Sequence, residues 1–235
     1  MKGRGTGYAR LKRSIDSLRM QEDQRFGVSV IDDGSEFEET WFIPELLGPL
    51  RERTTLIRRR SRHGYIRNFI EAIEAVCRND ESLIVTLDLD DALMSSSVSA
   101  QLLNVIDDGA DLVHGVMFRP DKPLHLYEPD YDNPRTKGGG NVWAHLRGLR
   151  KSLFQQIPKD HLRIDGHWVD DVTDYAIMMP AAELAQKPAF IHDIFCYYHE
   201  RDPYSAERKH EQQEILRRLF SYSSLSCPST RADTA

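Results

Sequence analysis

The apolar run SLIVTLD, at residues 82–88, constrains the fold more than any other part of the sequence. The run is short, and its apolar side chains do not alternate with polar ones. This pattern is typical of a strand that is buried on both faces. Such a strand needs other elements packed on each side of its sheet. We therefore expect a sheet that is covered by helices.

The first half of the chain alternates strand and helix patterns around this run. Helices are predicted at 8–21, 43–50, 66–76 and 95–107, and strands at 26–31, 54–57, 82–88 and 111–118. This alternation predicts an α/β fold with a mostly parallel sheet.

The second half has a different organisation. Residues 119–141 form a Pro/Gly-rich loop that ends in KGGGN. Simple connections are seldom longer than about 15 residues, so we interpret this loop as functional or mobile. After it we expect helices at 142–157, 176–184 and 205–220, a strand at 189–200, and a disordered tail from 221. The sequence shows neither an internal repeat nor a domain linker.

Composition excludes several classes of protein. The formal net charge of −6 argues against a general nucleic-acid binder. The three cysteines have no C-x-x-C spacing, so neither a zinc site nor a disulfide framework is indicated, and we expect a cytoplasmic protein. No apolar run approaches the ~20 residues that span a bilayer, and the first residues do not resemble a signal peptide. Peripheral contact with a membrane stays open.

Charged clusters follow three of the predicted strands. They are the pair Asp32–Asp33, the arginine-rich stretch 58–62, and the acidic group Asp88, Asp90 and Asp91. In an open α/β sheet, ligands bind beyond the carboxyl ends of the strands. Carboxylate oxygens hold Mg²⁺ or Mn²⁺, and arginines bind phosphate oxygens. The three clusters therefore favour a divalent cation together with a phosphorylated ligand.

At this point the residues carry a resemblance to a known family. The order RLKRSIDSLRMQ, FGVSVIDDGSE, RRSRHGYIRNFIEAIEAV and SLIVTLDLDDAL, over about residues 8–95, resembles the family 2 glycosyltransferases with a GT-A fold. The resemblance implies a single catalytic domain at 1–220, with a nucleotide-sugar half at 8–118 and an acceptor half at 119–220. It also implies transfer of a sugar from a nucleotide-diphosphate sugar, UDP-sugar by default, to a carbohydrate or other hydroxyl acceptor. The activity would be of the hexosyltransferase type.

The family motifs also suggest roles for individual residues. Asp33 in DDGS would face the base or ribose of the nucleotide, with Asp32 beside it. Arg67 and Asn68 match the family's RN, which helps to shape the nucleotide site.

The D-x-D of the family falls on Asp88 and Asp90. The resemblance implies that Asp90 ligates Mn²⁺ or Mg²⁺, and that Asp88 contacts ribose or a metal-bound water. Asp91 is the candidate N-cap or supporting residue. His199, in YYHERDP, is a candidate third ligand.

The catalytic base has three candidates. Most family members invert the anomeric centre, and a carboxylate takes the proton of the attacking hydroxyl. Asp170 and Asp171 resemble the family's ED pair. Asp174 leads directly into AIMMPAAE, which resembles a subgroup pattern in which an Asp starts a helix near the reaction centre. We rank Asp174 first, Asp171 second and Asp170 third.

Other interpretations stay open. DLDD by itself is also typical of a helix N-cap, and DDGS of a simple turn. The run LIVTLDLDDAL also resembles the first motif of haloacid-dehalogenase-like phosphatases, with Asp88 as nucleophile and Asp90 as acid. A third alternative is a non-catalytic domain that only binds a nucleotide sugar.

One feature departs from the family pattern. The family places a buried strand before the first helix, and MKGRGTG cannot be such a strand. An unpaired sheet position favours self-association, so a homo-oligomer is a further expectation.

Overall fold

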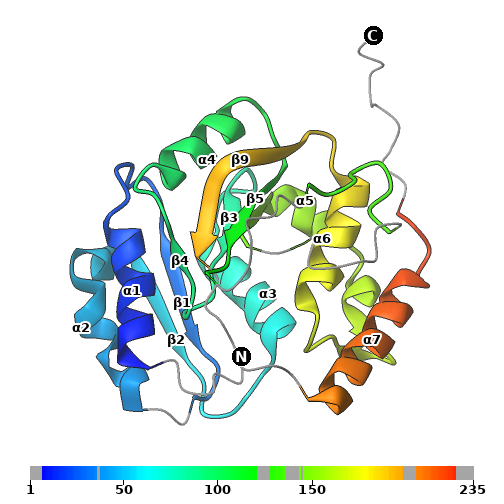
Figure 1. Cartoon of the computed structure of the whole chain (residues 1–235), viewed down its shortest axis with the longest axis horizontal. Helices are drawn as coiled ribbons and strands as arrows, with labels where there is room; N and C mark the ends of the chain where they lie inside the picture. Colours follow the sequence, from blue (N-terminus) through cyan, green and yellow to red (C-terminus); the bar gives the residue numbers. More distant parts are fainter. Residues whose placement is uncertain are drawn as a thin grey trace.

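The computed structural model describes residues 7–35, 38–120, 128–135, 143, 145–197 and 205–225. The chain forms an α/β fold, as expected. Figure 1 shows α1, α2, β1 and β2 on one side of the central strands, and α6 and α7 on the other. Within the described residues, no helix is long and apolar enough to cross a membrane.

The N-terminal part has its own small sheet and core. It contains α1 (Tyr8–Arg19), β1 (Val28–Asp32), the 3-10 helix η1 (Glu38–Phe42), α2 (Ile43–Leu47), the 3-10 helix η2 (Gly48–Arg53), β2 (Thr54–Arg58) and α3 (Tyr65–Val76). β1 and β2 pair in parallel, from Val28 opposite Thr54 to Asp32 opposite Arg58. Apolar side chains of α1, α2 and β1 form one buried cluster, so α1 covers this small sheet.

The central sheet has five strands in the order β3-β6-β5-β9-β4. They are β3 (Leu83–Thr86), β4 (Ala92–Leu93), β5 (Leu112–Phe118), β6 (Arg147–Arg150) and β9 (Pro188–Tyr197), and α4 (Val98–Asp107) lies between β4 and β5 in the chain. β5 and β9 are parallel, and the other pairs are antiparallel. The central sheet is therefore mixed, whereas the small sheet is parallel.

The remaining elements form the second flank of the central sheet. They are α5 (Lys151–Gln156), the 3-10 helix η3 (Lys159–Leu162), the hairpin strands β7 (Arg163–Ile164) and β8 (His167–Trp168), α6 (Thr173–Leu184) and α7 (Ala206–Phe220). α6 is buried along almost its whole length from Tyr175. A helix that is apolar all round belongs in a core, and α6 lies at the centre of the largest apolar cluster.

The helix predicted at 142–157 is partly wrong. Its centre is the strand β6, and only its end, α5, is helical. β6 pairs with β3 on one side and with β5 on the other, so tertiary pairing overrides the local helical pattern. Gly148 suits this position, because a Cβ there would lie 3.2 Å from the Ile84 carbonyl oxygen.

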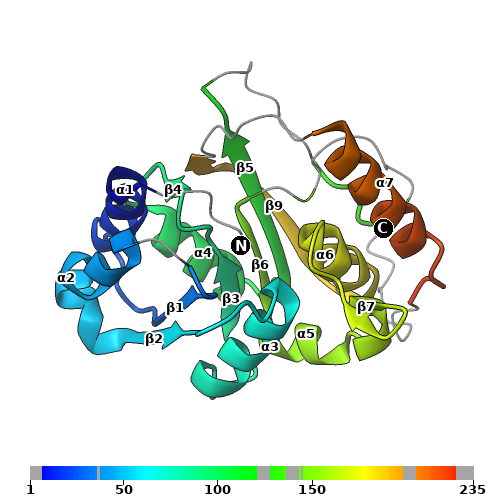
Figure 2. The ribbon, with the colours of Figure 1, turned by 90° about the horizontal axis from the view of Figure 1, so that it is seen from below.

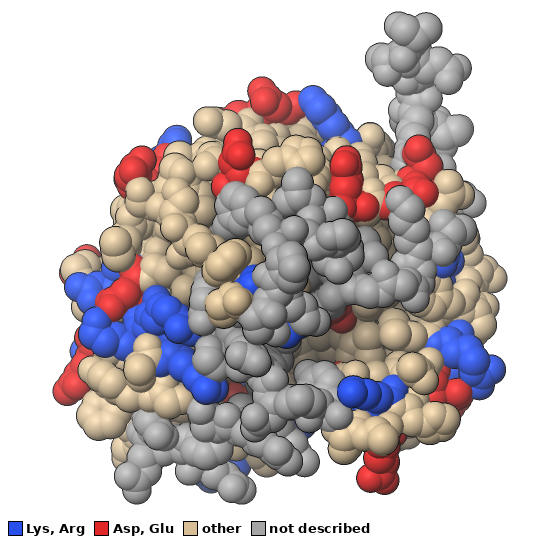
Figure 3. All heavy atoms as spheres, viewed as in Figure 1, with Lys and Arg blue, Asp and Glu red and all other residues tan. Residues whose placement is uncertain are grey.

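Charged groups of both signs are scattered over the visible surface (Figure 3). Lys and Arg side chains gather on the side that carries α1 and α2. On this face the charges are otherwise mixed, in keeping with the modest net charge of −6.

Candidate active site

Asp33 anchors the loop that leads into α3. Its Oδ1 accepts a hydrogen bond from the His63 amide at 2.8 Å, and its Oδ2 accepts one from the Gly64 amide at 3.0 Å. Burial opposes the charged form of Asp33. The hydrogen bonds from Asn68, His63 and Gly64 outweigh burial and hold the pKa of Asp33 below its usual value. Asp33 is thus a satisfied carboxylate that fixes the β2–α3 loop.

The neighbouring residues of the two family motifs also stabilise this corner. Asp32 Oδ1 accepts the Ser35 amide at 2.9 Å, which closes the turn of DDGS. Asn68 Oδ1 accepts a hydrogen bond from Arg59 Nε at 3.3 Å. Arg67 lies farther out, where its Nε donates to Glu71 at 3.0 Å.

The acidic sequence after β3 forms a turn. β3 ends at Thr86, and the Asp91 amide donates to the Asp88 carbonyl oxygen at 3.0 Å. The strand predicted at 82–88 therefore ends earlier than expected, and Asp88 and Asp90 both lie beyond it. Asp91 is followed by the strand β4 and not by a helix, so its expected N-cap role is also wrong.

The turn brings Asp88 and Asp91 together with His145. One ligand atom from each of these three residues lies within 4.8 Å of the others. His145 Nε2 is 3.6 Å from Asp88 Oδ2 and 3.9 Å from Asp91 Oδ2. Asp91 is 0% exposed and His145 is 4% exposed. Asp90 is not part of this cluster. Its carbonyl oxygen accepts a hydrogen bond from Arg13 at 3.0 Å.

The geometry of this cluster is compatible with a divalent cation. Bond lengths of about 2.1 Å place neighbouring ligands of an octahedral ion roughly 3 Å apart, and opposite ligands roughly 4 Å apart. The two His145 distances lie in this interval. His145 Nδ1 is 3.3 Å from the Thr86 carbonyl oxygen. A proton on Nδ1 would leave the Nε2 lone pair facing the carboxylates, which is the usual arrangement of a metal-binding histidine.

Asp174 lies in the first turn of α6, and its carboxyl group is in a different environment from that of Asp33. Burial raises the pKa of Asp174, and the charge of Arg147 opposes the rise. The charge of His145 also lowers the pKa of Asp174. The start of α6 is therefore electrostatically coupled to the cluster of Asp88, Asp91 and His145.

Arg147 links Asp174 to the acidic turn. Its side chain, on β6, is buried, and Nη1 donates to the Trp143 carbonyl oxygen at 2.9 Å. Burial alone would lower the pKa of Arg147. Tyr65, Asp174 and Asp88 outweigh burial and raise it. Sequence reasoning missed Arg147, because an arginine in a segment predicted as helix carries no signal of a buried role.

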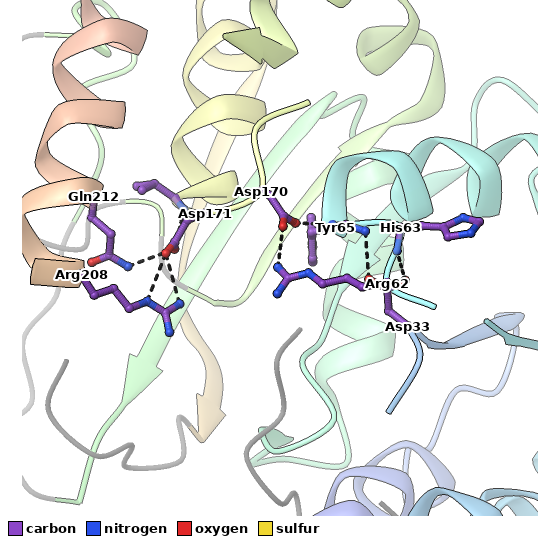
Figure 4. Close-up of polar contacts among 10 residues, drawn as sticks. Asp33, Arg62, His63, Tyr65, Asp170, Asp171, Arg208 and Gln212 are labelled. Atoms are coloured by element: carbon purple, nitrogen blue, oxygen red, sulfur yellow. Dashed lines mark hydrogen bonds and ion pairs between the residues drawn. The ribbon is translucent and has the colours of Figure 1, made fainter. Parts of the chain in front are cut away.

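The side chains of Asp170 and Asp171 point away from each other and contact different elements (Figure 4). Asp170 accepts the Tyr65 amide at 3.3 Å and pairs with Arg62 at 2.6 Å. Asp171 accepts hydrogen bonds from two residues of α7, Arg208 at 3.2 Å and Gln212 at 3.0 Å. The pair therefore connects the α3 loop with the C-terminal helix.

The backbone between Asp171 and α6 is strained. Val172 has φ = 56°, a conformation that β-branched residues rarely adopt. Asp171 Oδ1 accepts the Val172 amide at 2.9 Å and holds this turn. Strain of this kind persists where the surroundings impose it, and it is concentrated at functional sites.

One cleft of about 290 Å³ collects most of the predicted nucleotide-binding residues. Asp32, Asp33, Asn68 and Asp88 all line it, together with apolar residues of β1, β3 and α3. Arg67 is not among its lining residues. His199, the remaining candidate, lies outside the described residues.

Comparisons with known proteins agree with this arrangement. Crystal structures of Staphylococcus aureus TarS 1-349, alone and in complex with UDP-GlcNAc, superpose with TM-scores of 0.61 and 0.62 at 14% identity. They cover 94% of this chain, which spans only 63% and 64% of those chains. GalNAc-T7 with UDP, GalNAc and Mn²⁺ has a TM-score of 0.57 at 14% identity, over 83% of this chain and 42% of that one.

These likenesses confirm the expected GT-A-like fold. The search of curated proteins gave no match. The sequence profile of glycosyl transferase family 2 matches residues 5–173, which is well over half of the chain. The chain belongs to glycosyl transferase family 2.

Proposed function

We propose that this protein is a metal-dependent, inverting glycosyltransferase that moves a sugar from a UDP-sugar to an acceptor hydroxyl. The observation that carries the proposal is the cluster formed by Asp88 and Asp91, which follow β3, and His145, which precedes β6. Asp174 is coupled to this cluster through His145 and Arg147. A cation site and a carboxyl group with a raised pKa are the two elements that such a reaction needs.

The cation would be held by Asp88, Asp91 and His145. Two carboxylates and an imidazole suit Mn²⁺, and Mg²⁺ is the alternative. When bound, the metal neutralises charge on the diphosphate leaving group. Asp90 is the competing ligand, since the family's D-x-D includes it.

The cleft beside β1 and β3 would bind the nucleotide. Asp32, Asp33, Asn68 and Asp88 contribute its polar groups. Arg67, which does not line the cleft, is a further candidate from the family motif. The choice of UDP is supported by TarS and GalNAc-T7, which have been crystallised with UDP-GlcNAc and with UDP.

Asp174 would act as the base. Its carboxylate accepts the proton of the acceptor hydroxyl while that oxygen attacks the anomeric carbon and the bond to UDP breaks. A raised pKa makes a carboxylate a stronger base, and Arg147 keeps an opposite charge close to it. Asp171 and Asp170 are the second and third candidates, and both are engaged in ion pairs.

Calorimetric titration with UDP in the presence of Mn²⁺ tests the metal site. We compare Asp91→Asn with Asp90→Asn, since these residues are adjacent and the two changes are equal in size. If the cluster is the metal site, Asp91→Asn abolishes Mn²⁺-dependent binding and Asp90→Asn retains most of it. The reverse result would assign the ligand to Asp90. Absence of binding in the unmodified protein would contradict the proposed function.

The phosphatase alternative also uses Asp88, and it predicts hydrolysis of simple phosphate esters without a nucleotide. The non-catalytic alternative predicts binding of UDP with no release of UDP from a UDP-sugar. An assay of donor hydrolysis beside an assay with a generic phosphate ester separates the three functions. The family match favours the glycosyltransferase.

A further inference from the structure

The neighbouring helices α6 and α7 begin in two different ways (Figure 2). α7 has a usual N-cap. Ser205 is extended, with φ = −58° and ψ = 157°, and its Oγ accepts the Arg208 amide at 3.2 Å. α6 begins after Val172, which has φ = 56° and ψ = 33°. The Val172 carbonyl oxygen accepts the Ala176 amide at 3.3 Å, so Val172 holds the N-cap position of α6.

In α6, Asp174 lies where a capping side chain would act. The first amides of an α-helix have no carbonyl partner within the helix, and the N-cap side chain usually accepts the second or third of them. A valine has no side-chain oxygen for this purpose. Burial raises the pKa of Asp174, whereas hydrogen bonds from the amides of Tyr175 and of Asp174 itself act in the opposite direction. The Asp174 carboxylate therefore lies at the amides that an N-cap oxygen would otherwise bind.

The left-handed turn at Val172 is held from two sides. On one side, Asp171 Oδ1 accepts the Val172 amide at 2.9 Å, and the same oxygen accepts a hydrogen bond from Gln212 of α7 at 3.0 Å. On the other side, the Val172 side chain packs against the largest apolar cluster. A β-branched residue rarely adopts this conformation, so its surroundings impose it.

A helix start without this strain is possible, and Ser205 of α7 shows its form. An extended Ser or Thr before α6 would avoid the left-handed backbone and would cap the helix. Its oxygen would also compete with the Asp174 carboxylate for the Tyr175 amide. Val172 therefore costs stability, and it leaves that amide to Asp174.

We propose that Val172 is a positioning residue for sugar transfer, an N-cap without a side-chain oxygen that lets the first amides of α6 hold the Asp174 carboxylate. The proposal rests on the proposed function, in which Asp174 is the base. Val172 acts only through Asp174 and does not contact a substrate. A base has to lie within hydrogen-bond reach of the proton that it accepts. A carboxylate that turns away from its amides therefore lowers the rate, even when the donor still binds.

Two substitutions of Val172 test this role in opposite directions. Val172→Thr keeps the shape of the side chain but adds an oxygen, which favours an extended, capped start of α6. Val172→Gly adds no oxygen, and glycine adopts the left-handed conformation readily. We expect kcat for UDP release from a UDP-sugar to be at least ten-fold lower in Val172→Thr than in Val172→Gly, with the same KM for the donor. If Val172 only packs against the core, the order is reversed, because Val172→Gly loses the whole side chain. Equal kcat values would also overturn the proposal.

Val105→Thr is the control for the chemical change itself. Val105, in α4, is also half-buried and packs against an apolar cluster, but it lies in the interior of its helix. We expect Val105→Thr to keep the kcat of the parent. A loss of kcat as large as that in Val172→Thr would show that any hydroxyl in a half-buried valine position slows the reaction, and the proposal would fail.

Crystal structures of the two Val172 variants test the role without a measurement of turnover. In Val172→Thr we expect residue 172 to have a negative φ, and the Asp174 carboxylate to have left the Tyr175 amide. In Val172→Gly we expect φ to stay near the 56° of the parent, with the Asp174 contact kept. An unchanged turn and an unchanged Asp174 contact in Val172→Thr would overturn the role of Val172. A parent protein that releases no UDP would contradict the proposed function, and the structures would still decide how Asp174 is held.

Discussion

Asp33 and Asp174 lie in two regions of the molecule that surround a carboxyl group in opposite ways. Asp33 receives two backbone amides and the Asn68 side chain, and these contacts hold its pKa below the usual value. Burial raises the pKa of Asp174, and Arg147 offsets only part of this. Burial is the largest influence on both pKa values, but the carboxyl group of Asp174 lies deeper, and only at Asp33 do the hydrogen bonds outweigh burial.

This difference separates a structural carboxylate from a reactive one. A carboxylate with satisfied oxygens stabilises the fold and has little tendency to take a proton. A carboxylate whose burial outweighs its hydrogen bonds and nearby positive charges costs stability when charged, and it is a better base. The comparison therefore predicts that replacing Asp33 and replacing Asp174 have opposite effects.

The largest effect is expected for Asp174→Asn on turnover. If Asp174 is the base, its loss lowers the rate about 10²–10⁴-fold, whereas the cleft that we propose binds UDP is unchanged. Release of UDP from a UDP-sugar measures turnover, and calorimetry measures UDP binding. Asp171→Asn is the matched control and keeps most of the activity. If Asp171→Asn is the inactive variant, the base is Asp171 and the ranking of the candidates is wrong.

Asp33→Asn tests the other side of the comparison. Asn has one acceptor oxygen in place of two, so its NH₂ group would face one of the two backbone N–H donors and leave that donor unsatisfied. We expect a loss of about 1–3 kcal/mol in the free energy of unfolding. Because the folded pKa of Asp33 is lowered, this stabilisation is present above the unfolded pKa. It disappears as the pH falls through the folded pKa. Urea titrations of both proteins from pH 7 downward should therefore converge.

Asp174→Asn should change stability with the opposite sign. The folded pKa of Asp174 is raised, so the charged form costs stability at every pH above the unfolded pKa. The variant is then more stable than the parent at pH 7, and the gain disappears on acidification. Destabilisation by Asp174→Asn at pH 7 would mean that Arg147 binds Asp174 as a structural partner.

Short, ordered motifs were enough to predict that several of the candidate residues lie close together. Asp33 and Asn68 belong to motifs whose order follows the strands and α3, and local pattern was enough to place them. Asp91 and His145 were different. They lie close together only because the turn after β3 packs against the segment before β6, which is more than 50 residues away in the chain. No local sequence pattern could predict this contact.

Arg147 is a second residue whose role depends on contacts between distant parts of the chain. Its segment has a helical pattern, and it becomes a strand only because β3 and β5 offer edges on both sides. Because this segment was predicted as a helix, the burial of the Arg147 charge could not be foreseen. The polar contacts that shift pKa values at this site are long-range, and they depend on packing that a single sequence does not show.

Gly64→Ala should have an intermediate effect on stability and UDP binding. It tests the contact between the loop before α3 and Asp170, which precedes α6. Gly64 has φ = 88°, and a Cβ there would lie 2.8 Å from Asp170 Oδ1. With ψ = 156°, Gly64 lies in a region that essentially only glycine adopts, and such a conformation costs another residue about 1–3 kcal/mol. Gly166→Ala is the control, since Gly166 has φ = 79° and nothing within 4 Å of its added Cβ. We expect both variants to lose stability in urea, and only Gly64→Ala to weaken UDP binding. Equal UDP affinity in the two would show that the Asp170 contact does not shape the nucleotide cleft.

Arg208→Ala should have the smallest effect. It tests whether Asp171 is a structural carboxylate, like Asp33, or a candidate base, like Asp174. The side chains of Arg208 and Asp171 are 45% and 31% exposed, and ion pairs this exposed contribute about 0–1 kcal/mol. Arg217→Ala, which removes another exposed pair on α7, should cost the same in urea. If Asp171 only joins the loop to α7, both variants keep the rate of UDP release. If Asp171 is the base, removing the adjacent cation changes the rate in Arg208→Ala alone, because a nearby positive charge favours the unprotonated carboxylate.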